Sequence, residues 1–280
     1  MTERPTGPDL TPTFVNAKAE RVKQVRALAG RSARSKTGRF LVEGPQAVRE
    51  AVRFAPTRVR DLYLTEDAAT RYSEIVADAQ AAELYVHIGT PQVLEAMSPD
   101  AQGVVAVLDN AGVSLDDVLG AATPPRLIMV LSNVRDPGNA GTAIRVADAA
   151  GADAVVLAGE SVDPANPKVV RASAGSLFHL PVVRSLPLDD ALVALAGAGL
   201  QIVAADGSGT SELGDGDAGT EFLAKPTAWV FGNEAWGLRE DELSLADAVV
   251  SLPIYGKAES LNLATAASVC LYASARAQRR

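Results

Sequence analysis

Three polar stretches of the sequence each follow an apolar run that is predicted to be a β-strand. They are residues 133–145 (NVRDPGNAGTAIR), 231–238 (FGNEAWGL) and 252–262 (LPIYGKAESLN). In open α/β sheets, ligands bind outside the carboxyl ends of the strands, so these stretches stand where a site is expected. We therefore expect any chemistry to come from their arginine, glutamate, serine and asparagine side chains.

The first stretch has features of an anion-binding helix start. Pro137 and Gly138 favour a turn, and Asn139 lies near the start of a helix whose free N–H groups attract anions. Arg145 follows Asn139 by six residues, which does not place both on one helix face, so Asn139 is expected before or at the helix start. A strand-to-helix connection with a surface arginine is an equally good interpretation. In the second stretch, Glu234 between two glycines also fits a simple glycine-rich turn.

The C-terminal segment predicts a buried helix. Residues 260–274 carry no charged side chain, so this helix packs in the core or against a partner. Ser260 is able to cap it with its hydroxyl, which leaves Asn262 in the first turn. From this segment alone, a well-capped core helix is the favoured interpretation.

Composition limits the classes of protein and of site. The chain has 280 residues, 48% hydrophobic and 21% charged, which suits two modest domains. No apolar run is long enough to span a bilayer and no signal peptide is recognised, so a cytoplasmic protein without membrane association is expected. The lone Cys270 reads as a core residue, and His87 and His179 are too few for a histidine-rich metal site, so we expect no metal. His179 lies in an apolar run and is expected in the core.

The order of predicted elements indicates two α/β domains. Residues 1–14 are predicted to be a flexible tail, 15–110 a small α/β domain, 111–124 a linker, and 125–280 a second domain. The second domain is expected to hold a doubly wound parallel sheet of five or six strands, with an acidic, glycine-rich loop at 207–219. Residues 16–29 predict a basic amphipathic helix, and 31–39 (RSARSKTGR) is judged too polar to pack and is predicted to be a basic loop.

The basic segment between Lys18 and Arg60 contrasts with the net charge of −8 for the chain. A solvated helix face and a phosphate-binding surface are both open interpretations. Aromatic residues are scarce there beyond Phe40, so no platform for stacking bases is predicted.

Taken together, the three stretches resemble the SpoU (TrmH-like) family of RNA ribose methyltransferases. The resemblance rests on asparagine, glycine and arginine in the first stretch, glycine-x-glutamate-x-x-glycine in the second, and proline with serine-leucine-asparagine in the third. The amino half, through GRFLVEGPQAV, resembles the family's ribosomal-protein-like (L30e-like) α/β substrate-binding domain. The resemblance implies a SPOUT fold, in which the C-terminal parallel-sheet domain is tied into a deep trefoil knot and binds S-adenosylmethionine. It also implies a homodimer that completes the site.

The resemblance assigns roles to individual residues of this sequence. The set implied to act on or orient the substrate is Arg145, Asn139, Glu234, Ser260 and Asn262. The set implied to bind the cofactor is Gly232, Leu252 and Leu261 through their main chain, with Ala204, Asp206 and Gly237. RNA contacts are expected from Arg31, Arg34, Lys36, Arg39, Lys168 and Arg171, although a surface helix explains the last two nearly as well. Leu252 and Tyr255 depart from the commoner isoleucine and methionine.

The implied reaction is methyl transfer to a ribose 2′-hydroxyl of structured RNA, with ribosomal RNA favoured over transfer RNA. A guanidinium stays protonated in proteins, so Arg145 is expected to clamp the phosphate and the 2′-oxygen rather than to act as a base. The alternatives are a transfer-RNA methyltransferase, a non-catalytic RNA-binding or assembly factor, and an unknotted nucleotide-binding oxidoreductase. The last rests only on GSGTSELG (207–214), which lacks the GxGxxG spacing.

Overall fold

The computed structural model describes residues 10–215 and 219–279, and these divide into two compact units. Unit 1 comprises the described residues up to Ala111 together with Ala165–Pro167, and unit 2 comprises Gly112–Pro164 and the described residues from Lys168 onwards. Residues 1–9 of the predicted tail lie outside the described part. Its last residues touch the fold, because the backbone N–H groups of Thr13 and Phe14 both bond to the carbonyl of Ile88.

Unit 1 is built on a mixed four-stranded sheet. Its strands are β1 (Arg39–Glu43), β2 (Val59–Leu64), β3 (Val86–Ile88) and β4 (Val104–Asp109), in the spatial order β1-β4-β2-β3. The helices are α1 (Glu20–Ala27), α2 (Arg31–Thr37), α3 (Pro45–Phe54), η1 (Pro56–Arg58), α4 (Glu66–Arg71), α5 (Ser73–Ala81) and α6 (Pro91–Met97). Central β4 runs antiparallel to both neighbours, while β2 and β3 are parallel. The small α/β unit predicted for the amino half is thus present.

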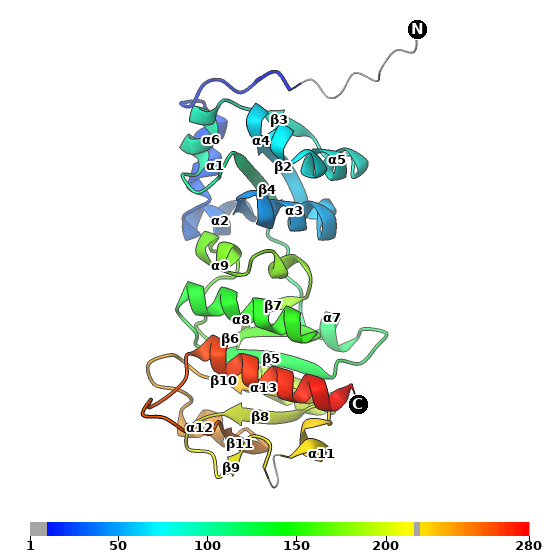
Figure 1. Ribbon diagram of the computed structural model, residues 1–280, viewed down its shortest axis with the longest axis vertical. Coiled ribbons are helices and arrows are strands. Elements are labelled where there is room, and N and C mark those ends of the chain that lie inside the picture. Colours follow the sequence, from blue (N-terminus) through cyan, green and yellow to red (C-terminus); the bar gives the residue numbers. More distant parts are fainter. Residues whose placement is uncertain (1–9, 216–218, 280) are drawn as a thin grey trace. The chain divides into compact units, whose positions relative to one another are not determined.

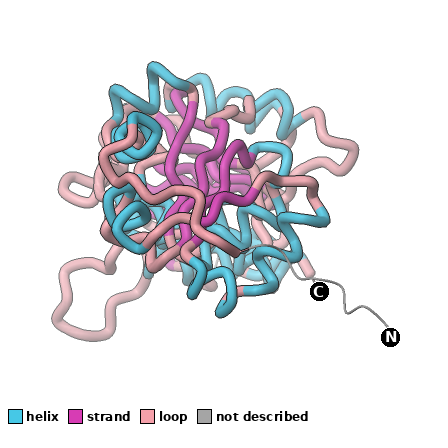
Figure 2. The backbone as a smooth tube through the Cα atoms, turned by 90° about the horizontal axis from the view of Figure 1, so that it is seen from above, coloured by secondary structure: helices cyan, strands magenta, loops and turns pink. Residues whose placement is uncertain are grey.

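Alternation along the strands of unit 1 sends side chains to two helical layers. Leu41, Tyr63 and Val107 pack with Val22 and Val25 of α1 and with residues of α6 in one core cluster. Side chains at the intervening positions point to the opposite face, where α3 contacts β1 and β4 and packs against α5. In Figure 2 the strands accordingly lie inside and the helices outside.

The segment predicted as a basic loop is helix α2, so that prediction was wrong. The helix ends at Gly38, whose left-handed φ of 63° suits glycine. Its Arg34 is only 4% exposed and donates hydrogen bonds to the carbonyls of Leu28 (3.1 Å) and Ala29 (2.9 Å), where α1 ends. A polar segment therefore packs because one guanidinium satisfies the carbonyls left open at a helix C-terminus.

Unit 2 holds a seven-stranded sheet in which every pairing is parallel. Its strands are β5 (Leu127–Ser132), β6 (Ala154–Ala158), β7 (Val182–Leu186), β8 (Gln201–Ala205), β9 (Ser211–Glu212), β10 (Thr227–Phe231) and β11 (Ala248–Ser251), in the order β7-β6-β5-β10-β8-β11-β9. The strand beyond the predicted five or six is β9, which lies in the predicted loop and pairs with β11.

Helices cover both faces of this sheet. The helical segments that follow β4 in the chain are α7 (Leu115–Leu119), α8 (Pro137–Ala150), α9 (Pro167–Ala172), η2 (Ser176–Phe178), α10 (Leu188–Gly197), α11 (Thr220–Leu223), α12 (Glu240–Leu243) and α13 (Leu263–Gln278). The residues predicted as a linker contain α7, whose buried Leu115 and Val118 join a core cluster of unit 2. No helix in the described part of the chain is long and apolar enough to cross a membrane.

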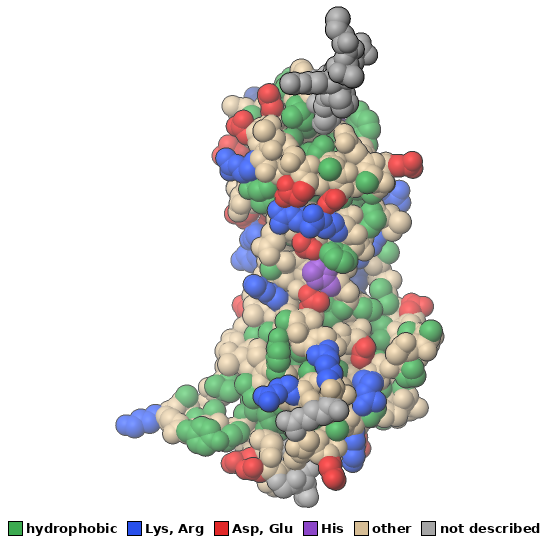
Figure 3. All heavy atoms as spheres, turned by 45° about the vertical axis from the view of Figure 1, so that its right-hand side comes forward, with side chains coloured by type: hydrophobic (Ala, Val, Ile, Leu, Met, Phe, Trp, Pro, Cys, Tyr) green, Lys and Arg blue, Asp and Glu red, His purple; other side chains and the backbone are tan. Residues whose placement is uncertain are grey.

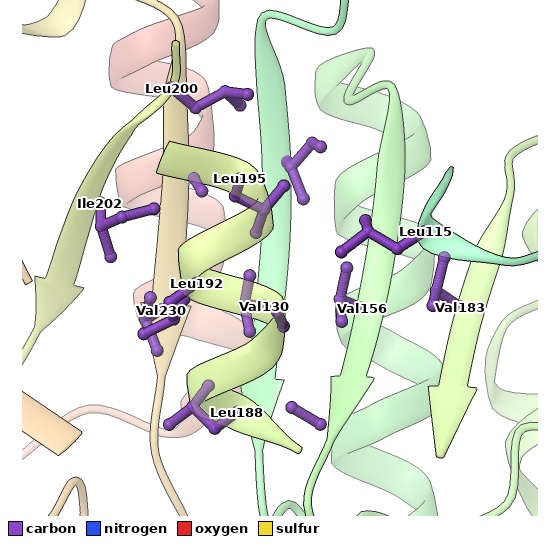
Figure 4. Close-up of a cluster of buried hydrophobic side chains, with 14 of the residues drawn as sticks. Leu115, Val130, Val156, Val183, Leu188, Leu192, Leu195, Leu200, Ile202 and Val230 are labelled. Carbon is purple, nitrogen blue, oxygen red and sulfur yellow. The ribbon is translucent and has the colours of Figure 1, made fainter. Parts of the chain in front are cut away.

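The face under α10 is an aliphatic core. Leu188, Leu192 and Leu195 of α10 lie over Val130 of β5 and Val230 of β10 (Figure 4). Spacings of three and four residues put these leucines on one helix face, as an amphipathic helix requires. This core packs against the central strands β5 and β10 of the sheet.

The opposite face is covered by α8 and α13, which pack against each other (Figure 1). Trp229 of β10 is fully buried and its indole N–H donates to the Ser274 hydroxyl of α13 at 2.9 Å. Cys270 is also fully buried, as predicted. The outer side of α13 is open in a single chain, with Val269 44% and Tyr272 46% exposed.

Candidate functional site

A cavity of about 480 Å³ lies at the carboxyl ends of β8, β10 and β11 and at the loop that leads into α13. We call it the strand-end cavity. Nearly every residue predicted for the cofactor or the substrate lines it: Asn139, Asp206, Gly232, Glu234, Gly237, Leu252, Ser260, Leu261 and Asn262. The three polar stretches therefore meet, because parallel strands deliver the loops that follow them to one edge of the sheet.

The loop after β10 needs its two glycines. Asn233 and Gly237 exchange two backbone hydrogen bonds of 3.0 and 2.9 Å, which closes a tight turn. Gly237 has a φ of 69°, a conformation that other residues rarely adopt. A Cβ atom on Gly232 would lie 2.3 Å from the carbonyl carbon of Gly237, so only glycine fits there. The turn thereby holds the Glu234 side chain at the cavity.

Asn233 was missed by the sequence analysis. It is buried, donates from its side chain to the Asn133 carbonyl at 2.6 Å, and accepts from the Ala235 N–H at 2.8 Å. The first bond connects the loop after β10 with the end of β5, and the second lies within the loop. The available signal was a polar amide placed directly after a buried strand, a position where it must bond to nearby backbone.

Glu234 contacts the backbone that leads into α8. Its carboxylate accepts from the N–H groups of Asp136 (3.2 Å) and Arg135 (3.4 Å), and from the side-chain amide of Asn139 (3.3 Å). The carboxylate is thus held by donors near the positive end of a helix. Glu234 and Asn139, which come from different polar stretches, are therefore directly hydrogen-bonded.

The two helices that border the strand-end cavity are joined at their first turns. Asp136 caps α8 by accepting from the Asn139 N–H at 2.7 Å. Asn262 caps α13 by accepting from the Ala264 N–H at 3.0 Å, and it donates to the Asn139 side-chain oxygen at 2.9 Å. Asn139 is the third residue of α8, slightly later than expected.

Ser260 is not the helix cap that the sequence suggested. Asparagine and serine are about equally good in this position, and the helix uses Asn262 and begins at Leu263. Ser260 is exposed and lines the cavity two residues earlier. The hydroxyl is therefore placed where a ligand could contact it.

The charges around the cavity are acidic. Asp206, Glu234 and Glu259 contribute carboxylates, and none of the described residues that line it is lysine or arginine. Asp206 is fixed by the Ser208 backbone N–H (2.9 Å) and hydroxyl (2.8 Å). An acidic lining favours a ligand that carries positive charge.

Two predicted residues do not line the cavity. Ala204 is buried within β8 and packs in the core under α10, and its neighbour Ala205 lines the cavity instead. The reason is the alternation of side chains along a strand. Arg145 lies on α8, well past the first turn, and is exposed.

Behind the site, a buried carboxylate ties β5 to α12. Glu242 accepts from the Ser132 hydroxyl (2.8 Å), the Asn133 side chain (3.1 Å) and the Arg239 N–H (2.8 Å). Asn133 adopts a left-handed φ of 55° and accepts from the Glu160 N–H at 3.0 Å. This buried cluster was not predicted, because Glu242 lies in a run of acidic residues that is typical of a surface helix.

The residues predicted to contact RNA are spread over both units. Arg31, Lys36 and Arg39 are exposed in unit 1, and Lys168 and Arg171 are exposed on α9. Arg34 is buried as described above, so its guanidinium is committed to the fold. His179, which was predicted in the core, is exposed and lies 2.7 Å from the Asp148 carboxylate. No group of three or more potential metal ligands occurs within residues 10–215 and 219–279.

Comparison with known proteins identifies both parts of the chain. Residues 126–272 match the SpoU rRNA Methylase family, and residues 19–106 match the MRM3-like substrate binding domain. The 23S rRNA (uridine(2479)-2′-O)-methyltransferase of Streptomyces viridochromogenes is 36% identical over 94% of this chain and 91% of that protein. The 23S rRNA (guanosine(2553)-2′-O)-methyltransferase RlmP of Bacillus subtilis is 33% identical over 92% of this chain and 96% of that protein.

Solved structures resemble this chain over nearly its full length. The crystal structure of the SpoU methyltransferase AviRb from Streptomyces viridochromogenes in complex with the cofactor AdoMet has a TM-score of 0.78 at 33% identity and covers 93% of this chain and 99% of that one. An AdoMet-bound rRNA methyltransferase from Sinorhizobium meliloti has a TM-score of 0.80 at 29% identity and covers 94% of this chain and 97% of that one. With the family model, the full-length relatives and the meeting of the three polar stretches in agreement, the chain belongs to the SpoU rRNA methylase family.

Proposed function

We propose that this protein transfers a methyl group from S-adenosylmethionine to a ribose 2′-hydroxyl of ribosomal RNA. The observation that carries the proposal is the meeting of Asn139, Glu234 and Asn262 at one cavity beside the glycine turn of β10. Ribosomal RNA is favoured because the relatives that span this chain are named as 23S rRNA 2′-O-methyltransferases. Family membership leaves the oxidoreductase alternative without support.

The strand-end cavity fits the proposed cofactor. Bound there, S-adenosylmethionine supplies an electrophilic methyl group on a positively charged sulfonium. The acidic side chains Asp206, Glu234 and Glu259 suit that charge, and Gly232, whose backbone packs against that of Gly237, borders the same cavity. The main chain of Gly232, Leu252 and Leu261 would hold the cofactor, with Gly237 and Asp206 beside it.

Asn139 and Glu234 would orient the ribose. The side chain of Asn139 is fixed at both ends, because its oxygen accepts from Asn262 and its amide donates to Glu234. Ser260 stands at the same cavity and would contact the substrate or the cofactor. Side chains restrained in this way present their polar groups to a reacting hydroxyl without a further loss of entropy on binding.

Arg145 would clamp the phosphate next to the target ribose and stabilise the negative charge that develops on the 2′-oxygen. A guanidinium remains protonated, so the hydroxyl proton would leave late, to a phosphate oxygen or to water. Arg145 does not line the cavity of its own chain. We therefore propose that the arginine is supplied across a homodimer, and the exposed Val269 and Tyr272 of α13 support an interface on that helix.

The remaining family features complete the proposal. We propose that the C-terminal segment is threaded into a trefoil knot, and the return of α13 from β11 to pack on α8 and β10 supports it. Residues 15–110 are proposed as the RNA-binding domain, 111–124 as the linker and 125–280 as the methyltransferase domain, in a cytoplasmic enzyme.

The test is methyl transfer by the purified protein. S-adenosylmethionine with a labelled methyl group is incubated with deproteinised 23S rRNA, 16S rRNA or transfer RNA, and the modified nucleotide is mapped by mass spectrometry. Label on a ribose of ribosomal RNA is expected. Label on transfer RNA alone would establish the transfer-RNA alternative, and tight RNA binding without any transfer would establish the non-catalytic factor.

A further inference from the structure

Unit 1 contains a cavity of about 460 Å³ to which no role has been given. It opens between α1 and the end of the sheet where β1 and β2 begin and β4 ends, and we call it the arginine cleft. Its floor is apolar, formed by Val25, Leu28 and Val107, which belong to the core of unit 1. Its rim is formed by Arg21, Arg39 and Arg60. An apolar floor with a cationic rim suits a flat heterocycle joined to an anionic group.

The rim arginines are positioned but remain accessible. The side chains of Arg21, Arg39 and Arg60 are 45%, 50% and 56% exposed. Arg39 and Arg60 lie 4.0 and 2.6 Å from the same Asp109 carboxylate, and Arg21 pairs with Asp61. Three guanidinium groups therefore face two carboxylates, which leaves positive charge at the mouth. The planar donor array of arginine matches phosphate oxygens.

The fold also gathers aromatic rings beside Arg21. Tyr63 and His87 are cross-strand partners stacked at a centroid distance of 4.8 Å, and Tyr85 packs on His87 at 4.5 Å. Arg21 donates to the Tyr63 hydroxyl at 2.7 Å and lies 3.4 Å from the His87 ring nitrogen. Tyr85 is 72% exposed. Tyr63 and His87 are buried, so Tyr85 is the ring of this group that solvent and a ligand can reach.

RNA binding at the arginine cleft would depend on the local arrangement of its side chains rather than on a wide basic surface. On the face shown in Figure 3, basic and acidic side chains are interspersed rather than sorted into one basic surface. The chain as a whole is acidic, with a formal charge of −8. A cationic rim, an apolar floor and a neighbouring exposed ring are the parts that single-stranded nucleic acid requires.

We propose that the arginine cleft holds an unpaired nucleotide of the substrate RNA. Its base lies on Val25 and Leu28, its phosphate lies at Arg39 and Arg60, and the next base stacks on Tyr85. This inference rests on the proposed RNA methyltransferase function and assigns Arg21, Arg60 and Tyr85 to substrate binding. It predicts that unit 1 recognises a loop or bulge, since bases in a duplex are not free to enter a cleft.

The first test compares Arg39→Gln/Arg60→Gln and Tyr85→Ala with wild type. The matched control is Arg53→Gln on α3, because Arg53 is similarly exposed at 42% and pairs with Asp78 at 2.7 Å. Binding of a 23S rRNA fragment containing the mapped target is measured at several salt concentrations. Tyr85→Ala is expected to weaken binding by about 5- to 150-fold with little change in salt dependence. The double variant is expected to reduce the salt slope by about 1 to 2.

Kinetics separate RNA recognition from chemistry. For both cleft variants the KM for RNA is expected to rise, while kcat at saturating RNA and the Kd for S-adenosylmethionine stay at wild-type values. The proposal would be overturned if both cleft variants had the same RNA affinity and the same KM as wild type and Arg53→Gln. The proposed function fails in a different way, namely if the wild-type protein neither binds nor methylates ribosomal RNA.

Crosslinking of the wild-type protein tests the cleft without substitutions, so its result does not depend on whether the variants fold. The same RNA fragment is substituted with 4-thiouridine at unpaired positions, irradiated in complex with the full chain, and digested for mass spectrometry. Crosslinked peptides are expected from residues 21–39, 60–63 and 85. Crosslinks in unit 1 that fall only outside these residues would contradict the proposal.

Discussion

The side-chain amide of Asn262 donates a 2.9 Å hydrogen bond to the side-chain oxygen of Asn139, across 123 positions of sequence. Asn139 lies in the first turn of α8 and Asn262 is the N-cap of α13, so this bond fixes the start of α13 against the start of α8. Asn139 in turn donates to Glu234. One short chain of side-chain bonds therefore connects all three polar stretches.

Replacing Asn262 with aspartate separates its two roles. Aspartate caps a helix as well as asparagine does, so stability is expected to stay close to wild type. It offers no N–H to Asn139, and we expect at least an approximately tenfold lower kcat because Asn139 loses its restraint. Asn262→Ala removes the cap as well and is expected to cost about 1 kcal/mol of unfolding free energy. Urea unfolding and methyl-transfer rates measure both effects, and a fully active Asn262→Asp enzyme would contradict the role of the bond.

Gly232→Ala tests the glycine turn. The new methyl would meet the Gly237 backbone at 2.3 Å, so the turn must open, at a cost of about 1–3 kcal/mol. Binding of S-adenosylmethionine, measured by calorimetry, is expected to be lost or strongly weakened. The control is Gly256→Ala in the loop before α13, where an added Cβ has no neighbour within 4 Å. Equal binding by both variants would show that the turn does not shape the cofactor site.

Arg145 offers a test of the proposed dimer. Arg145→Lys is expected to lose most of its transfer rate and to keep its cofactor affinity, because lysine lacks the planar donor array. When Arg145→Ala and Gly232→Ala proteins are unfolded together and refolded, each mixed dimer holds one intact site if the arginine acts in the partner. About a quarter of wild-type activity should then return for random pairing into two-fold dimers. Activity that stays at the level of the separate variants would place the arginine in its own chain.

A pH–rate profile addresses the proton. If Arg145 only stabilises charge, Arg145→Lys lowers the rate at every pH and leaves the apparent pKa values of the profile unchanged. A new ionisation in the Arg145→Lys profile, in the range of a lysine, would instead identify this position as the base.

His87 makes the stability of unit 1 depend on pH. Burial lowers the pKa of His87 more than its contact with Asp61 raises it, and nearby Arg21 lowers it further. The unfolded chain therefore binds a proton at higher pH than the folded one. Stability is expected to fall as the pH drops below the unfolded value of about 6.5 and to level off below the folded pKa. Urea midpoints at pH 7.5 and 5 should show a smaller loss in His87→Gln, and an equal loss would contradict the assignment.

The sequence was most informative where strands end. Polar residues after apolar runs predicted which loops meet, because parallel strands leave little freedom in where their carboxyl ends lie. It was less informative where two residues are equally able to fill one role, as Ser260 and Asn262 are for the N-cap of α13. Ala204 and Ala205 show the same limit, since the last side chain to face a core depends on where the strand leaves the sheet.

Other features depend on contacts that no local pattern contains. Arg34 became buried because α1 ends beside it, and its neighbours alone indicate a solvated loop. The rings of Tyr63, Tyr85 and His87 meet only when β2 and β3 pair. Composition and spacing carry information about residues that are close in the sequence. These sites are formed by residues that are distant in the sequence and meet only when the strands pair.

The position of β11 and α13 in the chain has a consequence for synthesis. Leu252, Ser260 and Asn262 complete the strand-end cavity, and α13 covers Trp229 of the central strand β10. These residues leave the ribosome after every other part of the sheet, whereas all strands of unit 1 precede residue 110. Domains fold in the order in which they are made. A nascent chain is thus able to form unit 1, the unit proposed to bind RNA, well before it can hold the methyl donor, so a translation product that stops near residue 250 is expected to bind RNA without modifying it if that proposal holds.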